Sequence, residues 1–127
     1  MSKILQFQSV RTDDSSAEAL DEKVRFAIAE RRLLQFDYGG CRRIVEPHDY
    51  GVIKDIRRLL VYQRSKVGSI GTQAIGWRLL DFPKIVRCVV LDTRFAGTRE
   101  SPAQQPYDWD VLYARVADTA SGPQDRG

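Results

Sequence analysis

Arginine is the residue type in this chain best suited to bind a ligand, and the basic residues are concentrated in its middle. Residues 31–87 contain twelve Lys and Arg against five Asp and Glu, a local charge of +7, while the whole chain carries +3. A guanidinium presents a planar fork of N–H donors that matches the oxygens of a phosphate or carboxylate. This concentration favours an anionic partner, although a solubilising surface would give the same composition.

Arg78 has the most informative surroundings, because Trp77 and further apolar residues flank it in a predicted strand. A charge in such a strand needs a partner, which is either an internal carboxylate such as Glu46 or an external anion. Arg57 and Arg58 lie on or beside another predicted strand, where alternation turns them to opposite faces, so only one of them can easily face the same pocket. Both could instead form a solvated strand end that discourages edge pairing.

The sequence lacks the residue sets of common catalytic and metal sites. The single histidine, His48, has no Cys or Ser neighbour in a recognisable nucleophile motif, and one His with two Cys cannot complete a zinc site. Neither a Walker loop nor a dinucleotide-binding glycine motif occurs. We therefore expect no enzymatic activity and no cofactor. Cys41 and Cys88 lie far apart, form no CxxC motif and are expected to be free thiols.

The elements that must position these side chains are predicted to be one helix followed by six short strands. A capping box at Ser15 and Glu18 precedes apolar residues at helical spacing, which predicts a helix over residues 15–32. Alternating and apolar segments then predict strands at 34–38, 42–46, 50–53, 59–62, 75–80 and 85–91. Pro47 is expected to end the second of them. Six short strands joined by tight turns indicate a small antiparallel barrel, because closure removes exposed edges.

The two ends of the chain are predicted to lie outside the main domain, which covers residues 15–96. Residues 1–14 form an N-terminal segment, whose residues 4–10 could add a strand to a sheet edge or to a partner. Residues 97–127 form a C-terminal extension, in which apolar residues at i, i+3, i+4 and i+7 predict a short helix starting at Asp108. The chain lacks a long apolar run and a signal peptide pattern, which predicts a cytoplasmic protein with no membrane partner.

Two separated segments carry a recognisable family pattern. In RLLQFDYGGCRRIVEPHDYGV the matching residues are Tyr38, Arg43, Val45, Glu46 and Pro47. In GWRLLDFPKIVRCVVLDTRF they are Trp77, Arg78, Leu79, Asp81, Ile85 and Phe95. Together they cover about residues 22–96, and this region resembles a stand-alone WYL domain. The tripeptide that names the family would fall at Arg57, Arg58 and Leu59, so only its Leu is present.

The resemblance implies both a fold and a role. The family fold is an Sm-like, SH3-type barrel, so we expect a mainly β protein with an N-terminal helix and a short C-terminal helix. WYL domains are typically ligand-sensing parts of bacterial transcription regulators, and several are thought to bind nucleotides or single-stranded nucleic acid. Arg43 and Arg78 match the arginines expected in the ligand pocket. Tyr38 and Trp77 could stack a base, although such residues more often pack in a core.

Three functions remain open from the sequence. The first is a regulatory sensor that binds a nucleotide or short single strand and signals to a separate DNA-binding or effector protein, because a single helix before the barrel leaves no room for a winged helix. The second is a direct binder of single-stranded RNA or DNA, whose affinity would fall steeply with salt. The third is a protein-interaction subunit with no small ligand, such as a homodimer formed through residues 4–10 or the final helix.

Overall fold

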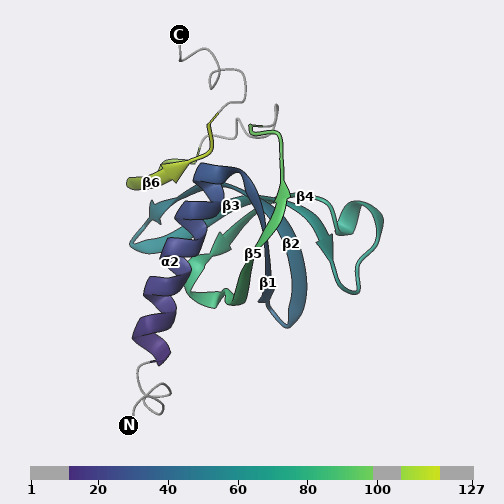
Figure 1. The fold of residues 1–127 in the computed structure, drawn as a ribbon, viewed down its shortest axis with the longest axis horizontal. Helices are drawn as coiled ribbons and strands as arrows, with labels where there is room; N and C mark the ends of the chain where they lie inside the picture. Colours follow the sequence, from purple (N-terminus) through teal and green to yellow (C-terminus); the bar gives the residue numbers. More distant parts are fainter. Residues whose placement is uncertain (1–11, 99–106, 118–127) are drawn as a thin grey trace.

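The computed structural model describes residues 12–98 and 107–117, which contain one α-helix and six β-strands (Figure 1). This confirms a mainly β fold led by a helix. The elements are α2 (Thr12–Glu30), β1 (Arg32–Tyr38), β2 (Cys41–Ile53), β3 (Ile56–Lys66), β4 (Gly76–Asp81), β5 (Val86–Arg94) and β6 (Val111–Arg115). Two 3-10 turns, η1 (Gly71–Gln73) and η2 (Phe82–Lys84), precede and follow β4. Residues 4–10, for which an edge strand was predicted, lie outside the described residues.

Helix α2 carries the predicted apolar stripe and ends where the backbone becomes left-handed. The stripe is buried at Leu20, Val24, Ala27 and Ile28. Arg31 follows with a φ of 56°, a conformation common just after a helix. The helix extends back to Thr12, so the predicted cap at Ser15 lies within it. None of the helical segments in the described part of the chain combines the length and hydrophobicity that crossing a bilayer requires.

The strands form one antiparallel open sheet in the order β4-β3-β2-β1-β5, with β6 paired to β2. Among the described residues no ladder joins β4 to β5, so the closed barrel remains a prediction. The sheet nevertheless curls, and a hydrogen bond between distant strands shows this. The backbone N–H of Asp81 at the end of β4 donates to the hydroxyl of Tyr38 on β1 at 2.9 Å. In a flat sheet these strands would lie about 14 Å apart, beyond the reach of a tyrosine side chain.

Strand β2 corrects the prediction that Pro47 separates two strands. Cys41–Ile53 is a single strand of 13 residues that passes through Pro47. Its first part pairs with β1 as far as Val45, and its second part pairs with β6 from Asp49 onward. Pro47 lies in the gap between these two partners, and a bulge follows it in the ladder with β3. A sheet tolerates a residue without an N–H at such a position.

The C-terminal helix predicted from Asp108 onward is wrong, because Val111–Arg115 form strand β6. The apolar spacing suits a helix, but β1 leaves half of one edge of β2 without a partner, and unpaired backbone groups attract a strand. The N–H of Asp110 donates to the carbonyl of Val52, and the N–H of Val116 donates to that of His48, each at 2.8 Å. Tertiary pairing therefore overrides the local helical pattern.

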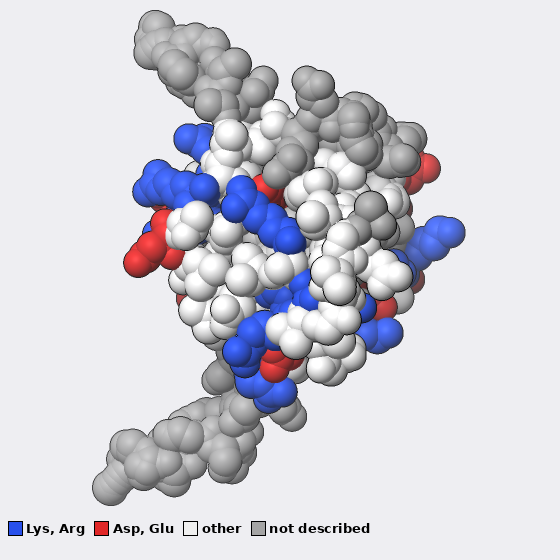
Figure 2. Space-filling model, turned by 90° about the vertical axis from the view of Figure 1, so that its right-hand side faces the viewer, with Lys and Arg blue, Asp and Glu red and all other residues white. Residues whose placement is uncertain are grey.

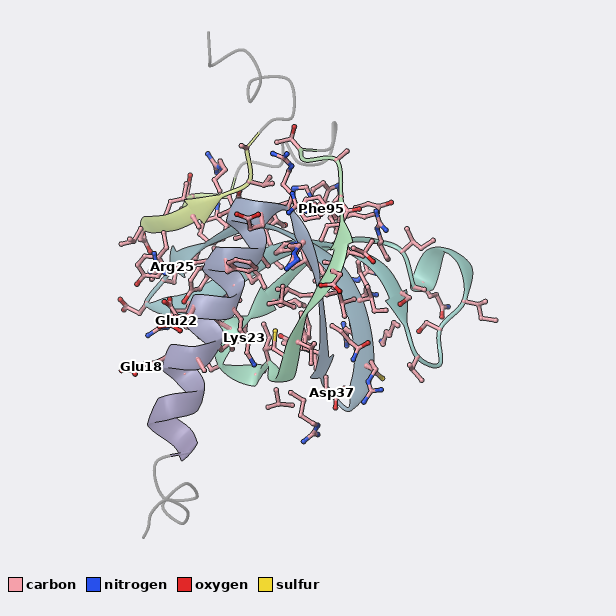
Figure 3. The ribbon with its side chains drawn as sticks, viewed as in Figure 1. Glu18, Glu22, Lys23, Arg25, Asp37 and Phe95 are labelled. Carbon is pink, nitrogen blue, oxygen red and sulfur yellow. The ribbon has the colours of Figure 1, made fainter. Side chains whose placement is uncertain are left out.

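The inner face of the curled sheet carries the core, and α2 covers one end of it (Figure 1). The apolar stripe of α2 packs there with residues of the sheet and of η2, which include Leu34, Phe36, Val45, Leu59, Val61, Leu80 and Phe82. Glu18 and Glu22 lie on the side of the helix away from the sheet, whereas Lys23 donates to the carbonyl of Cys88 in β5 at 2.9 Å (Figure 3). The helix leaves the far end of the inner face to polar side chains.

Candidate anion site

The structure divides the predicted ligand-binding residues between the two faces of the sheet. In the ladder of β3 and β4, Arg78 lies opposite Val61, which is buried in the core, while Trp77 lies opposite Tyr62 on the outer face. Arg43 also belongs to the inner face, since it pairs with the core residue Phe36 of β1. Arg43 and Arg78 therefore share a face, and Trp77 does not share it with them.

Arg43 is a buried cation on the inner face of the sheet. Its side chain is 9% exposed. One terminal nitrogen, Nη1, donates to Oε1 of Gln63, and the other, Nη2, donates to the backbone carbonyl of Tyr38, both at 3.1 Å. The guanidinium lies over the Tyr38 ring, 5.0 Å from its centroid. The third nitrogen, Nε, is buried and has no hydrogen-bond partner, so the donors of this cation are incompletely used.

Arg78 reaches the same region from β4, because Gly76 leaves room for it. Its Nη1 donates to the carbonyl of Trp77 at 2.9 Å, and its Nη2 donates to the carbonyl of Gln73 at 3.1 Å. A Cβ added at Gly76 would lie 3.0 Å from Nη1, so the guanidinium folds back over this glycine. Gly76 lies directly opposite Gln63 in the ladder. Arg78 and Gln63 are thus diagonal neighbours on the same face of the β3–β4 ladder.

Gln63 lies on β3, the strand between those that carry Arg43 and Arg78, and it was not among the predicted site residues. Its side chain is completely buried. The amide oxygen accepts from Arg43, and the amide nitrogen donates to the carbonyl of Ala74 at 2.8 Å. A signal was present in the sequence, because Gln63 continues the inward row of Leu59 and Val61, where a polar residue is unexpected.

In the described part of the chain, Arg43 and Arg78 bond only to neutral oxygens, whereas other arginines of the sheet form ion pairs. Arg58 lies 3.3 Å from Asp81, and Arg64 lies 2.9 Å from Glu46. Glu46, the internal partner considered for Arg78, is thus engaged elsewhere, and it also lies 3.3 Å from His48. The positive charges of Arg43 and Arg78 therefore remain available to an external anion.

The two predicted aromatic residues play packing roles in the structure. The ring of Trp77 lies 4.8 Å from that of His48 and 5.4 Å from that of Tyr62, on the outer face. Tyr38 supports Arg43 with its ring and accepts from the backbone of Asp81 with its hydroxyl. Only Tyr38 therefore contributes to the site that contains Arg43.

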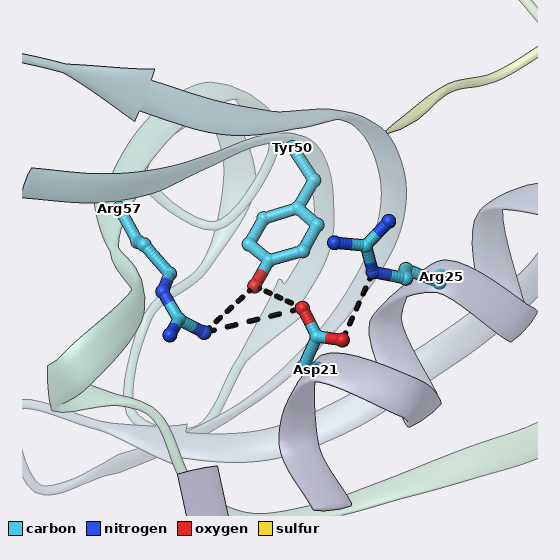
Figure 4. A network of polar contacts seen from close by, with 4 residues as sticks. All are labelled: Asp21, Arg25, Tyr50 and Arg57. Atoms are coloured by element: carbon cyan, nitrogen blue, oxygen red, sulfur yellow. Dashed lines mark hydrogen bonds and ion pairs between the residues drawn. The ribbon is translucent and has the colours of Figure 1, made fainter. Parts of the chain in front are cut away.

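Arg57 belongs to a separate polar network at the α2 end of the sheet (Figure 4). Its guanidinium donates to the hydroxyl of Tyr50 at 3.1 Å and lies 3.9 Å from Asp21. Tyr50 in turn donates to Asp21 at 2.7 Å, and Arg25 donates to the same carboxylate at 2.9 Å. Burial opposes ionisation of Asp21, but these hydrogen bonds and the charges of Arg25 and Arg57 outweigh it and hold the pKa of its carboxyl below the ordinary 3.8. Burial, together with the bond to Asp21, raises the pKa of Tyr50.

The charged side chains on the side of the molecule around β4 are mostly basic (Figure 2). Figure 2 shows more Lys and Arg than Asp and Glu on the face that carries β4 and the loop before it. A surface of one sign attracts ligands of the other. No group of three or more His, Cys, Asp or Glu in the described residues is arranged to hold a metal ion.

The fold and the site define a helix-led, six-stranded antiparallel sheet, and two arginines on its inner face have no carboxylate partner among residues 12–98 and 107–117. No family model, curated protein or solved structure matches this chain.

Proposed function

We propose that this chain is a non-catalytic, ligand-binding module of the WYL type, which binds an anion between Arg43 and Arg78. The supporting observation is that Arg43 bonds to Gln63 and Arg78 lies on the strand next to Gln63, and that among the described residues both arginines bond only to neutral oxygens. A buried cation without a counterion is unfavourable, and an anion that bridges both groups would relieve this. The curl of the sheet, in which Tyr38 reaches Asp81, is compatible with an SH3-type barrel.

The proposed ligand is a nucleotide or a short single-stranded nucleic acid. A phosphate group offers several oxygens, so it can accept from two guanidiniums at once. The basic side of the molecule would favour its approach (Figure 2). We propose that the ligand state is passed to a separate DNA-binding or effector protein.

Isothermal titration calorimetry with AMP and with a short oligothymidylate tests this function. Arg43→Gln and Arg78→Gln each remove one charge, and we expect each to weaken binding by roughly tenfold to hundredfold, because a hydrogen bond to a charged group contributes about 1.5–3 kcal/mol. Arg87→Gln is the matched control, since Arg87 is exposed and pairs with Asp37 at 2.8 Å. Wild-type protein that binds neither ligand, or variants that bind as tightly as wild type, would contradict the proposal.

The salt dependence of binding separates the two ligand classes. A strand that contacts many phosphates releases counterions, so its affinity falls steeply as salt rises. A single nucleotide held by two arginines should show a shallow dependence over the same range.

A protein-interaction subunit is the second candidate, and the loop between β3 and β4 favours it. Ile70 is 83% exposed and Val67 is 65% exposed on this loop. Exposed aliphatic side chains of this kind often mark a contact surface. A concentration-dependent dimer in analytical ultracentrifugation, combined with no affinity for either anionic probe, would favour this candidate.

A further inference from the structure

We infer that Gln63 is a positioning residue that holds Arg43 in the site while leaving its positive charge uncompensated. The inference rests on the proposed function and concerns the residue that gives the site its preference for anions. Its starting point is that a completely buried polar side chain occupies an inward position of β3. An apolar residue would fill such a position at lower cost unless the amide had a specific task.

The orientation of the Gln63 amide is determined by its two partners. The carbonyl oxygen of Ala74 can only accept, so the amide nitrogen must face it, at 2.8 Å. The guanidinium of Arg43 can only donate, so the amide oxygen must face Nη1, at 3.1 Å. No flipped arrangement satisfies both partners. The β3–β4 segment that contains Ala74 therefore fixes the acceptor that holds Arg43.

A neutral acceptor is what allows Arg43 to bind a second, charged acceptor. A carboxylate at position 63 would have the same length and would form a buried ion pair with Arg43. That pair would cancel the charge offered to a ligand, and an entering phosphate would be repelled by the carboxylate. The amide instead orients the guanidinium and leaves its full charge. The other acceptor of Arg43 among the described residues, the backbone carbonyl of Tyr38, is also neutral.

Arg78, the second arginine of the proposed site, is also held by neutral acceptors. Arg78 bonds to the carbonyls of Trp77 and Gln73, so its holders are neutral as well. Gln73 ends η1 and Ala74 follows it directly, so the C-terminal end of this one turn accepts from both Arg78 and Gln63. Changing the charge at position 63 therefore alters the field at both guanidiniums without removing either of them.

The binding test compares two substitutions of similar shape and different charge, with inorganic phosphate and AMP as probes. Gln63→Glu is expected to weaken binding of both probes by at least a hundredfold. Gln63→Met keeps the site charge and loses only the orienting bonds, so it should weaken binding by less than tenfold. If Gln63→Glu binds either probe as wild type does, or if both variants lose affinity equally, Gln63 does not act through charge and the inference is wrong.

A second measurement examines charge compensation without any ligand. Arg43→Met is made in the wild-type and in the Gln63→Glu background, and the Tm of each protein is measured. In the Gln63→Glu background, Arg43→Met leaves a buried carboxylate without its cationic partner. We therefore expect Arg43→Met to lower Tm by several degrees more in this background than in the wild-type background. Equal changes in the two backgrounds would mean that Arg43 is already compensated, which overturns the inference. If this cycle behaves as expected while wild type binds neither probe, the proposed function fails and the role of Gln63 stands.

Discussion

Substitution of Gly51 by alanine should detach strand β6, the element that the sequence pattern assigned to a helix. Gly51 lies on β2 beneath β6. A Cβ added there would lie 2.1 Å from the carbonyl oxygen of Val111, 2.9 Å from the ring of Trp109 and 3.0 Å from the Cα of Leu112. The first of these distances is more than an ångström too short for carbon and oxygen, and it involves backbone on both sides. Because neither strand can yield by a rotamer change, β6 must move away.

The cost of Gly51→Ala follows from what β6 loses. The backbone bonds of Asp110 and Val116 to β2, each 2.8 Å long, contribute about 1 kcal/mol apiece. Val116 is 4% exposed, and exposing a buried valine costs roughly 1.5 kcal/mol or more. We therefore expect a loss of about 3.5 kcal/mol in the free energy of unfolding. For a domain of this size that corresponds to a drop in Tm of roughly 10 °C.

Thermal and urea unfolding followed by circular dichroism measure this loss, and amide hydrogen exchange locates it. The control is Gly40→Ala, which adds the same methyl group where no heavy atom lies within 4 Å, although its φ of 81° adds backbone strain of about 1 kcal/mol. Gly51→Ala should also speed exchange at the amides of residues 111–116. Equal stability of the two variants, or unchanged exchange in β6, would refute the pairing of β6 with β2.

Two further predictions concern Tyr50 and the thiols. Tyr50→Phe removes the hydroxyl that donates to Asp21, so it should cost about 1.5–3 kcal/mol at pH 7. Because the pKa of Asp21 is lower in the folded than in the unfolded protein, the stability that ionised Asp21 contributes is present above the unfolded value of 3.8 and is lost as the pH falls through the folded pKa. Urea unfolding should therefore show the difference in unfolding free energy between Tyr50→Phe and wild type shrinking towards pH 2. A difference that stays constant with pH would contradict this. Burial, partly offset by the charge of Lys23, raises the pKa of the Cys88 thiol to about 11, so at pH 8 only about one molecule in a thousand carries the reactive thiolate there. Mass spectrometry after brief iodoacetamide treatment should find Cys41 alkylated first, and equal labelling would argue against a buried Cys88.

Much of the sheet was predictable because its local signals agree with its tertiary contacts. The alternation of β1, followed by Gly39 and Gly40 at φ values of 59° and 81°, specifies the first hairpin without reference to the rest of the chain. The apolar stripe of α2 likewise matches the face that becomes buried. Where pattern and packing coincide, reading one is sufficient to predict the other.

The errors occur where a distant partner decides the local structure. Pro47 would end a strand that had one continuous neighbour, but β2 changes its neighbour from β1 to β6 at that point. Residues 111–115 have a helical apolar spacing, yet they pair with the edge that β1 leaves open. A short stretch of sequence around Pro47 or around residues 111–115 cannot predict either structure, because both depend on pairing with strands far along the chain.

The candidate site shows the same division. Strand alternation by itself puts the neighbours Trp77 and Arg78 on opposite faces, and the ladder with β3 agrees. Arg43 and Arg78 were identified by type and by resemblance, but their proximity to Gln63 depends on the β2–β3 and β3–β4 registers together. The role of Gln63 is therefore a property of three strands, which the sequence of β3 alone does not display.

The charge balance of the middle segment shows why Arg43 is the cation with the least internal compensation. Residues 31–87 contain five acidic residues, and four of them pair with cations other than Arg43 and Arg78: Asp37 with Arg42 and Arg87, Glu46 with Arg64, Asp49 with Arg115, and Asp81 with Arg58 and Lys84. The fifth, Asp55, is exposed in the turn between β2 and β3. Exposed cations without a partner are stabilised by water. Arg43 is only 9% exposed, so water stabilises its charge far less. The excess positive charge seen in the sequence therefore has its largest energetic cost at this one buried guanidinium. An anion bound there would remove that cost.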